Sequence, residues 1–377
     1  MTMINETPKI KFNKEDSSAL LNGDGGEIPI FIGATGNTSP NANILEFKNY
    51  KEATATPENN GIGPEASSNH MLKILKDFFE ESMKLRPDDM GVPKVYVKDL
   101  GAQTTASAAS FTAAKAESRK KLDIQVEAYI FRSNASLENI IDLLEAIAAS
   151  LKEDTAKGKP RIAYVTVLGW DDDQLKTLTQ GIPTGENPVN KKIRDVDIAV
   201  IEYDKFGKQL ARICLTPYYD EPGYYPYRTV SEGEFTERTD DDEEDLQAKG
   251  IIFSHDEKPG KTAFPKINLA VSSAYAEPIN ERPLLSLIHV NRNVNQLIRD
   301  AMEVVYPQLK RRETETFIQE VQADLDLLCT NKIKAGYMKE GTKVTAVEYK
   351  DSPAKLKLKI KASPVNITGL IETTVYI

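Results

Sequence analysis

The chain has 377 residues, of which 40% are hydrophobic and 28% are charged, and its formal net charge is -9 at pH 7. This composition is typical of folded globular proteins and excludes collagen-like, coiled-coil and disordered chains. The length exceeds what one hydrophobic core usually serves, so two or three domains are expected. The acidic balance argues against general binding to nucleic acid or to anionic membranes.

The start of the chain carries no targeting signal that we recognise. Residues 1–14 are polar, and no stretch approaches the roughly 18 apolar residues that span a bilayer. We therefore expect a soluble protein that is made in the cytoplasm and is not inserted into a membrane. The two cysteines, Cys214 and Cys329, each lie in an apolar run, which supports neither a disulfide framework nor a zinc site.

The first two thirds of the chain read as a polar arm followed by an α/β body. Residues 1–27 mix charges with Ser, Asn and Gly, and only Lys9, Ile10, Lys11 and Phe12 alternate as a strand would. Apolar runs that end at glycine or polar residues predict strands, and apolar stripes at helical spacing predict helices. The expected strands are 28–33, 93–97, 124–131 and 161–168, and the expected helices are 68–85, 105–119 and 136–151. This alternation indicates βαβ units in a mixed sheet.

The pattern is weaker between residues 196 and 290. The apolar runs 196–203 and 210–215 flank Asp204-Lys205-Phe206-Gly207, which predicts a β-hairpin. A tyrosine-rich stretch and the acidic run 240–245 follow within residues 217–249, and we expect a surface loop and a solvated segment there. Short strands are predicted at 251–253, 267–271 and 284–290.

The last 85 or so residues predict a small α+β unit. A helix from Val294 ends at Pro307, and Thr316 with Gln319 resembles a capping box that opens a second helix. Strands are expected at 343–349, 356–362 and 370–377, and the alternation in 355–361 places lysines on one face. Residues 291–377 hold 14 Lys+Arg against 11 Asp+Glu, or +3, whereas residues 1–290 hold 34 against 46, or -12.

Catalytic and cofactor motifs are mostly lacking. His70, His255 and His289 are isolated, and Gly33-Ala34-Thr35-Gly36 lacks the third glycine of a dinucleotide-binding loop. Asp171, Asp172 and Asp173 follow a buried strand and could hold magnesium in a hydrolase, but the favoured alternative is that Asp172 or Asp173 caps a helix beginning near Gln174. We expect no enzyme activity, no cofactor and no metal site.

The C-terminal strand suggests self-assembly. A chain end normally frays unless something holds it, so a strand running to the last residue is expected to pair with a neighbouring sheet. A contact of this head-to-tail kind builds a polymer. The basic residues Arg292, Arg299, Lys310, Arg311 and Arg312 could contact phosphate or an acidic protein partner.

From about Arg282 to Ile377 the chain resembles the C-terminal domain of contractile tail sheath proteins of phages, R-type bacteriocins and related contractile injection systems. The resemblance rests on strand 284–290 leading into Asn291-Arg292-Asn293-Val294, on the helix pair, and on the ending 356–377. Residues 28–35 and 44–47 are similar to the early strand, turn and following segment of that family. The resemblance implies an N-terminal arm at 1–27, an outer α/β body at 28–281, an inner α+β domain at 282–365 and a donor strand at 366–377.

The resemblance also implies a function and partners. The subunit would polymerise around a tail tube as a helical homopolymer of stacked rings, contact baseplate and tail terminator proteins, and contract to drive the tube through a target envelope. It would be made in the host cytoplasm and become part of a phage tail or similar particle. Other tail or capsid assembly subunits and the magnesium-dependent hydrolase remain the alternatives. Strand exchange would use Lys9, Ile10, Lys11, Phe12, Ile371, Thr373, Val375 and Ile377, and the five basic residues would face the tube.

Overall fold

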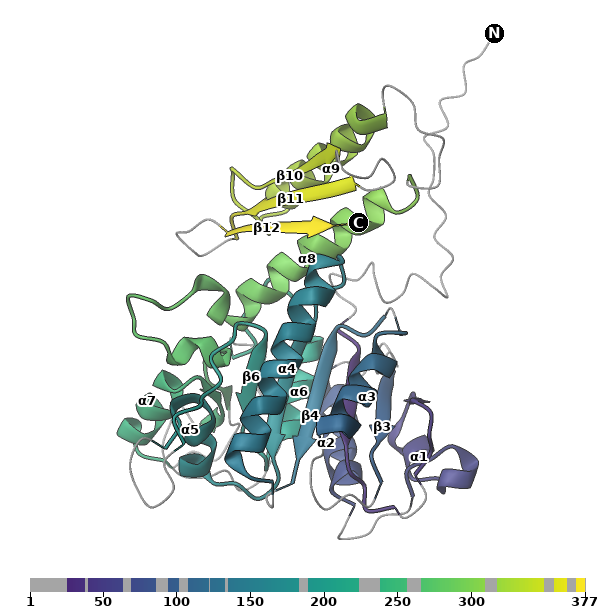
Figure 1. Cartoon of the computed structure of the whole chain (residues 1–377), viewed down its shortest axis with the longest axis vertical. Helices are drawn as coiled ribbons and strands as arrows, with labels where there is room; N and C mark the ends of the chain where they lie inside the picture. Colours follow the sequence, from purple (N-terminus) through teal and green to yellow (C-terminus); the bar gives the residue numbers. More distant parts are fainter. Residues whose placement is uncertain are drawn as a thin grey trace.

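The computed structural model describes residues 26–37, 40–63, 69–85, 94–101, 108–121, 123–132, 135–182, 189–223, 238–255, 266–308, 317–348, 356–364 and 371–376. These residues form a large α/β body and a smaller C-terminal unit at one end of it (Figure 1). One long helix leads from the body into the C-terminal unit. The predicted mixed α/β architecture is confirmed, whereas almost all of the predicted arm 1–27 lies outside the described residues.

The body contains a seven-stranded sheet with the order β2-β3-β1-β4-β5-β6-β7. Its strands are β1 Pro29–Gly33, β2 Leu45–Phe47, β3 Val95–Asp99, β4 Val126–Phe131, β5 Ile162–Val167, β6 Ile198–Ile201 and β7 Ile251–Ile252. β2 runs antiparallel to β3, and the other pairs are parallel. Since helices cover both faces, β1, β4, β5 and β6 are buried at every position, which explains their nearly continuous apolar sequences.

Helices cover the sheet on its two faces and form two hydrophobic cores. One core holds α3 (Ala108–Ser118), α4 (Leu137–Ala156), α5 (Asp172–Gln180) and α7 (Asp240–Ala248). The other holds α1 (Tyr50–Ala53), α2 (His70–Leu85) and α6 (Phe206–Leu215). A small two-stranded sheet pairs β8 (Ser254–His255) with β9 (Lys266–Ile267). The body is thus a three-layer α/β structure.

The hairpin predicted at 196–215 is wrong. Ile198–Ile201 is a strand, but Leu210–Leu215 belongs to α6, in which nine of ten residues are buried. A short apolar run does not distinguish a strand from a fully buried helix, because neither shows a polar face. Gly207 serves close packing rather than a turn: a Cβ atom there would lie 2.3 Å from the Ile74 carbonyl oxygen on α2.

The strand predicted at 284–290 is also wrong. Residues Leu284–Ser286 form a 3₁₀ turn, and α8 (Ile288–Val305) begins immediately afterwards. Most of the first turns of α8 are buried, including the polar Asn291, Arg292 and Asn295, so no apolar stripe marks them as helical. The expected helix from Val294 therefore begins six residues earlier. It ends at Val305, as Pro307 predicted.

The C-terminal unit consists of α8, α9 (Phe317–Lys334) and a three-stranded antiparallel sheet with the order β10-β11-β12. Its strands, β10 Lys343–Glu348, β11 Leu356–Ala362 and β12 Ile371–Tyr376, agree with the three predicted from the sequence. The second half of α8, α9 and the inner faces of β10 and β11 share one apolar core. Since the first half of α8 packs in the body, this helix belongs to both units.

Candidate assembly surfaces

The terminal strand β12 forms one edge of the C-terminal sheet. It pairs antiparallel with β11 of the same chain, and its register places Ile371, Thr373 and Val375 opposite Ala362, Ile360 and Leu358. The single subunit therefore satisfies one side of β12 by itself, whereas its other side has no partner strand among the described residues. Pairing with a neighbouring subunit stays a prediction. It requires β12 to leave β11 of its own chain or to use its second edge.

Several of the predicted exchange and tube-facing residues lie outside the described residues. These are Lys9, Ile10, Lys11, Phe12, Lys310, Arg311, Arg312 and Ile377. Their predicted roles remain hypotheses.

Arg292 and Arg299 do not face outward, so this part of the predicted tube-facing surface is wrong. Arg292 is 1% exposed, and Arg299 is 7% exposed. The Arg292 Nε donates to Glu27 Oε2 at 2.9 Å, and its Nη2 donates to the Thr216 carbonyl oxygen at 2.6 Å. The Arg299 Nη2 donates to the Pro160 carbonyl oxygen at 2.8 Å. Both guanidinium groups instead bind α8 to the body.

The pKa values of the two arginines reflect their buried positions. Burial is the largest influence on Arg292 and opposes its positive charge, but the surrounding groups, with Glu27 foremost among them, together outweigh burial and raise the pKa of Arg292. For Arg299 burial dominates and lowers the pKa, although its Nη1 lies 3.7 Å from Glu27 Oε1. Because Glu27 also donates its backbone N–H to the Cys214 carbonyl oxygen, this cluster joins the start of the body, the end of α6 and α8.

A second polar cluster fixes the start of α8. The Asn291 amide donates to Asp197 Oδ1 at 2.9 Å and to the Val196 carbonyl oxygen at 2.8 Å. Burial raises the pKa of Asp197 to about 6, although the hydrogen bond from Asn291 lowers it. The carboxyl group is therefore near its titration range at neutral pH. The same helix contacts the body again through Gly158, whose added Cβ would lie 2.4 Å from Met302 Sδ.

The described part of the tyrosine cluster lies between the body and the C-terminal unit. Tyr219 stacks on Tyr337 with ring centroids 4.4 Å apart, and Tyr218 meets both rings edge-on. The Lys332 ammonium on α9 donates to Tyr218 Oη at 2.8 Å and pairs with Asp300 on α8. The sequence predicts a surface loop here, whereas the tyrosines that the structure describes pack on the C-terminal unit.

The three aspartates weighed as a magnesium site begin a helix. Asp171 is the N-cap of α5, and it forms a capping box with Gln174. Asp172 accepts two hydrogen bonds from Arg238, and Asp173 pairs with Lys176. Among the described residues no group of three His, Cys, Asp or Glu side chains could hold a metal ion. The predicted role, a helix cap, is confirmed, but the cap is Asp171 rather than Asp172 or Asp173, and α5 begins at Asp172 rather than near Gln174.

The three histidines, and the turn that follows β1, also have structural partners. His70 contacts Tyr203 Oη at 3.2 Å, His255 lies 3.4 Å from Glu243, and His289 lies 2.7 Å from Glu221. His289 lies on α8 rather than in the strand that was expected. In the turn after β1, the Thr35 hydroxyl donates to Asp99 Oδ1 at 2.7 Å.

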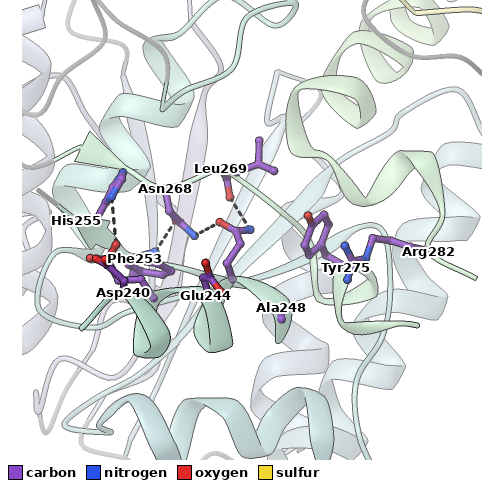
Figure 2. A pocket seen from close by; sticks show the side chains of 11 residues that line it. Asp240, Glu244, Ala248, Phe253, His255, Asn268, Leu269, Tyr275 and Arg282 are labelled. Atoms are coloured by element: carbon purple, nitrogen blue, oxygen red, sulfur yellow. Dashed lines mark hydrogen bonds and ion pairs between the residues drawn. The ribbon is translucent and has the colours of Figure 1, made fainter. Parts of the chain in front are cut away.

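One open pocket of about 530 Å³ lies beside α7 (Figure 2). Acidic side chains of α7, including Asp240 and Glu244, form one wall. Arg282 stacks on Tyr275 at the far end, with its guanidinium carbon 3.7 Å from the ring centroid. The pocket is therefore an open surface groove lined by both charged and apolar side chains. None of the described helices is long and apolar enough to cross a membrane.

Solved structures share this fold along almost the whole chain. A chain from the baseplate of the anti-feeding prophage gives a TM-score of 0.61 at 13% identity and covers 98% of both chains. The sheath tail protein Lin1278 from Listeria innocua gives a TM-score of 0.60 at 8% identity, covering 96% of this chain and 97% of that one. A sheath tail protein from Desulfitobacterium hafniense gives 0.57 at 9% identity and covers 100% of both.

No protein-family model and no curated protein matches the sequence. The structural likeness nevertheless confirms, at the level of fold, the resemblance to contractile tail sheath proteins that the C-terminal residues suggested. It extends that resemblance from about a third of the chain to the body as well. Sequence reasoning missed the Glu27–Arg292 cluster because its members are 265 residues apart, and no local pattern connects them.

Proposed function

We propose that this chain is a structural subunit of a contractile tail sheath. The observation that carries the proposal is the likeness to two sheath tail proteins over at least 96% of the chain, body and C-terminal unit together. The use of Asp171, Asp172 and Asp173 to begin α5 supports a structural rather than a catalytic role. The subunit polymerises around a tail tube, meets baseplate and tail terminator proteins at the ends, and forms part of a phage tail or related particle.

Strand exchange is the proposed link between subunits. β12 is an edge strand, and its antiparallel pairing with β11 covers Ile371–Tyr376. If β12 moves to β11 of a neighbour, each subunit gives one strand and receives one, so the number of paired backbone groups is conserved. Such a swap has a low thermodynamic cost. The segment Lys9–Phe12 is proposed to add to the same sheet from another subunit.

Contraction is proposed to be a rigid-body rearrangement in which exchanged strands keep subunits linked while other contacts repack. α8 suits this role because it is fixed in the body through Asn291 and Arg292 and in the C-terminal core through Leu297, Met302 and Val305. The energy is stored during assembly in the extended state, so no nucleotide is required. Contact with the tube is assigned to Lys310, Arg311 and Arg312, and their charge reversal should weaken tube binding without unfolding the subunit.

A disulfide lock tests strand exchange. Lys359 and Thr374 are directly opposed across β11 and β12, so Lys359→Cys with Thr374→Cys places two thiols at adjacent positions. The oxidised double variant should stay folded and monomeric, and reduction should restore polymers in negative-stain images. Each single variant is the control. Polymerisation of the oxidised variant at the parental rate would refute exchange of β12.

Deletion of residues 371–377 provides a second test. The shortened subunit should remain soluble, retain its circular dichroism spectrum and form no polymers.

The match to a chain of a baseplate structure favours one alternative, another subunit of the tail assembly near the baseplate. Electron microscopy of the purified protein separates the two. A sheath subunit should form tubes of variable length, whereas a baseplate subunit should stop at a single ring.

A further inference from the structure

The outer face of the C-terminal sheet is strongly basic. Alternate residues of a strand share one face, and the register pairs Lys343 of β10 with Lys361 of β11. Lys357, Lys359 and Lys361 therefore lie in one row with Lys343 beside them, while Leu356, Leu358 and Ile360 face the core. Of the four lysines, three are exposed and Lys357 is half-buried. Among the residues of β10 and β11 whose side chains the structure describes, this face carries four lysines and no acidic residue. We call this face of β10 and β11, with its four lysines, the lysine face.

The α7 surface is its chemical opposite. Asp240, Asp241, Asp242, Glu244 and Asp245 are all exposed on one short helix. Asp242 caps the helix with Thr239, and Asp245 binds Lys176. Within the described part of the chain, Asp240, Asp241 and Glu244 pair with no cation. Like charges at positions i and i+4, such as Asp240 with Glu244, destabilise a helix. A cationic partner would relieve this repulsion.

The two surfaces cannot meet within one subunit. The sheet lies in the C-terminal unit, whereas α7 lies in the part of the body away from it (Figure 1). Their spacings nevertheless match. Alternate residues along a strand repeat every ~6.6 Å, and residues i and i+4 of a helix repeat every ~6 Å. A helix lying along β11 can therefore bring Asp240 and Glu244 against successive lysines.

We propose that the lysine face of one subunit docks on α7 of a second copy of this chain. The proposal rests on the proposed function, because it adds a head-to-tail contact to the sheath polymer beside strand exchange. A contact between two different surfaces of the same chain does not close on itself and so extends a filament or a ring. Because the groups are exposed, the contact weakens as salt shortens the screening length, which is about 8 Å at 0.15 M.

Cysteine cross-linking tests the contact without altering the charges. Thr345 lies on the lysine face opposite Lys359, and Ala248 continues the row of Asp240 and Glu244 along α7. A Thr345→Cys chain mixed with an Ala248→Cys chain should form a disulfide-linked dimer under mild oxidation at low salt. The yield should fall at least fivefold in 1 M NaCl. Lys120→Cys, at an exposed position outside both surfaces, replaces either chain as the control. The native Cys214 and Cys329 are buried.

Charge exchange gives the second arm. Lys359→Glu with Lys361→Glu, or Asp241→Lys with Glu244→Lys, should each reduce the cross-link at least fivefold, and chains carrying opposite reversals should recover it when mixed. Circular dichroism checks that each variant is folded. Absence of the cross-link, or a lack of recovery on mixing, overturns the inference. So does a lysine-face variant that cross-links normally but fails to bind the tube, which would assign this face to the tube.

The cross-link tests this contact, whereas the formation of filaments tests the sheath assignment. A cross-link without filaments supports this contact and contradicts the sheath assignment, whereas filaments without a cross-link leave the sheath assignment and overturn the contact. Loss of both overturns both.

Discussion

Replacing Arg292 by methionine tests whether the junction between the body and the C-terminal unit depends on a buried charge. The variant loses the pair with Glu27 and the hydrogen bond to the Thr216 carbonyl oxygen. Glu27 is 6% exposed, so its carboxylate would remain buried near only the more distant Arg299. Removing one partner of a buried pair typically costs about 3–5 kcal/mol. We expect a loss of free energy of unfolding within that range.

Urea unfolding followed by circular dichroism measures this loss on monomeric protein. Glu27→Gln and the double variant complete a double-mutant cycle, in which contacting residues are expected to couple by about 0.5–3 kcal/mol. Lys120→Met, at an exposed position, is the control and should change stability by less than about 0.5 kcal/mol. A loss below about 1 kcal/mol for Arg292→Met, or no coupling, would refute the argument that this cluster holds α8 on the body.

Three further predictions concern the same framework. Since burial raises the pKa of Asp197 from 3.8 to about 6, the stability that its proton provides is complete below pH 3.8 and is lost as the pH rises through 6. Asp197→Asn should therefore be more stable than the parent at pH 7, by on the order of 3 kcal/mol, and only slightly more stable at pH 4. Urea unfolding at the two pH values measures this difference, and a variant that is less stable than the parent at pH 7 would contradict the reasoning. Asp171→Ala should lose about 1 kcal/mol, the usual value of an N-cap, and MgCl₂ should not raise the melting temperature of the parent. A rise would restore the metal hypothesis. Gly158→Ala should cost more than Gly336→Ala, because both have positive φ (73° and 77°) but only Gly158 meets Met302; equal losses would show that this close approach is unimportant.

Local patterns in the sequence determined a large part of this fold. The buried strands β1, β4 and β5 follow from apolar runs that end in polar or glycine residues. Ser136 caps α4 as predicted, and an aspartate caps α5, although it is Asp171 rather than the predicted Asp172 or Asp173. The lysine alternation of 355–361 predicted both the strand β11 and its two unlike faces. In each case the signal and the structure lie within one turn or one strand, so neighbouring residues suffice.

Tertiary structure decided what local patterns could not. Leu210–Leu215 lies in a helix whose burial, in a core shared with α2 and the sheet, leaves no polar face to mark it as helical, and burial likewise hid the start of α8. Arg292 appeared basic and exposed in the sequence, but it is neutralised by Glu27, 265 residues away. The fold brings such partners together only after the sheet and its helices are packed, because burial and charge pairing depend on distance in space rather than along the chain.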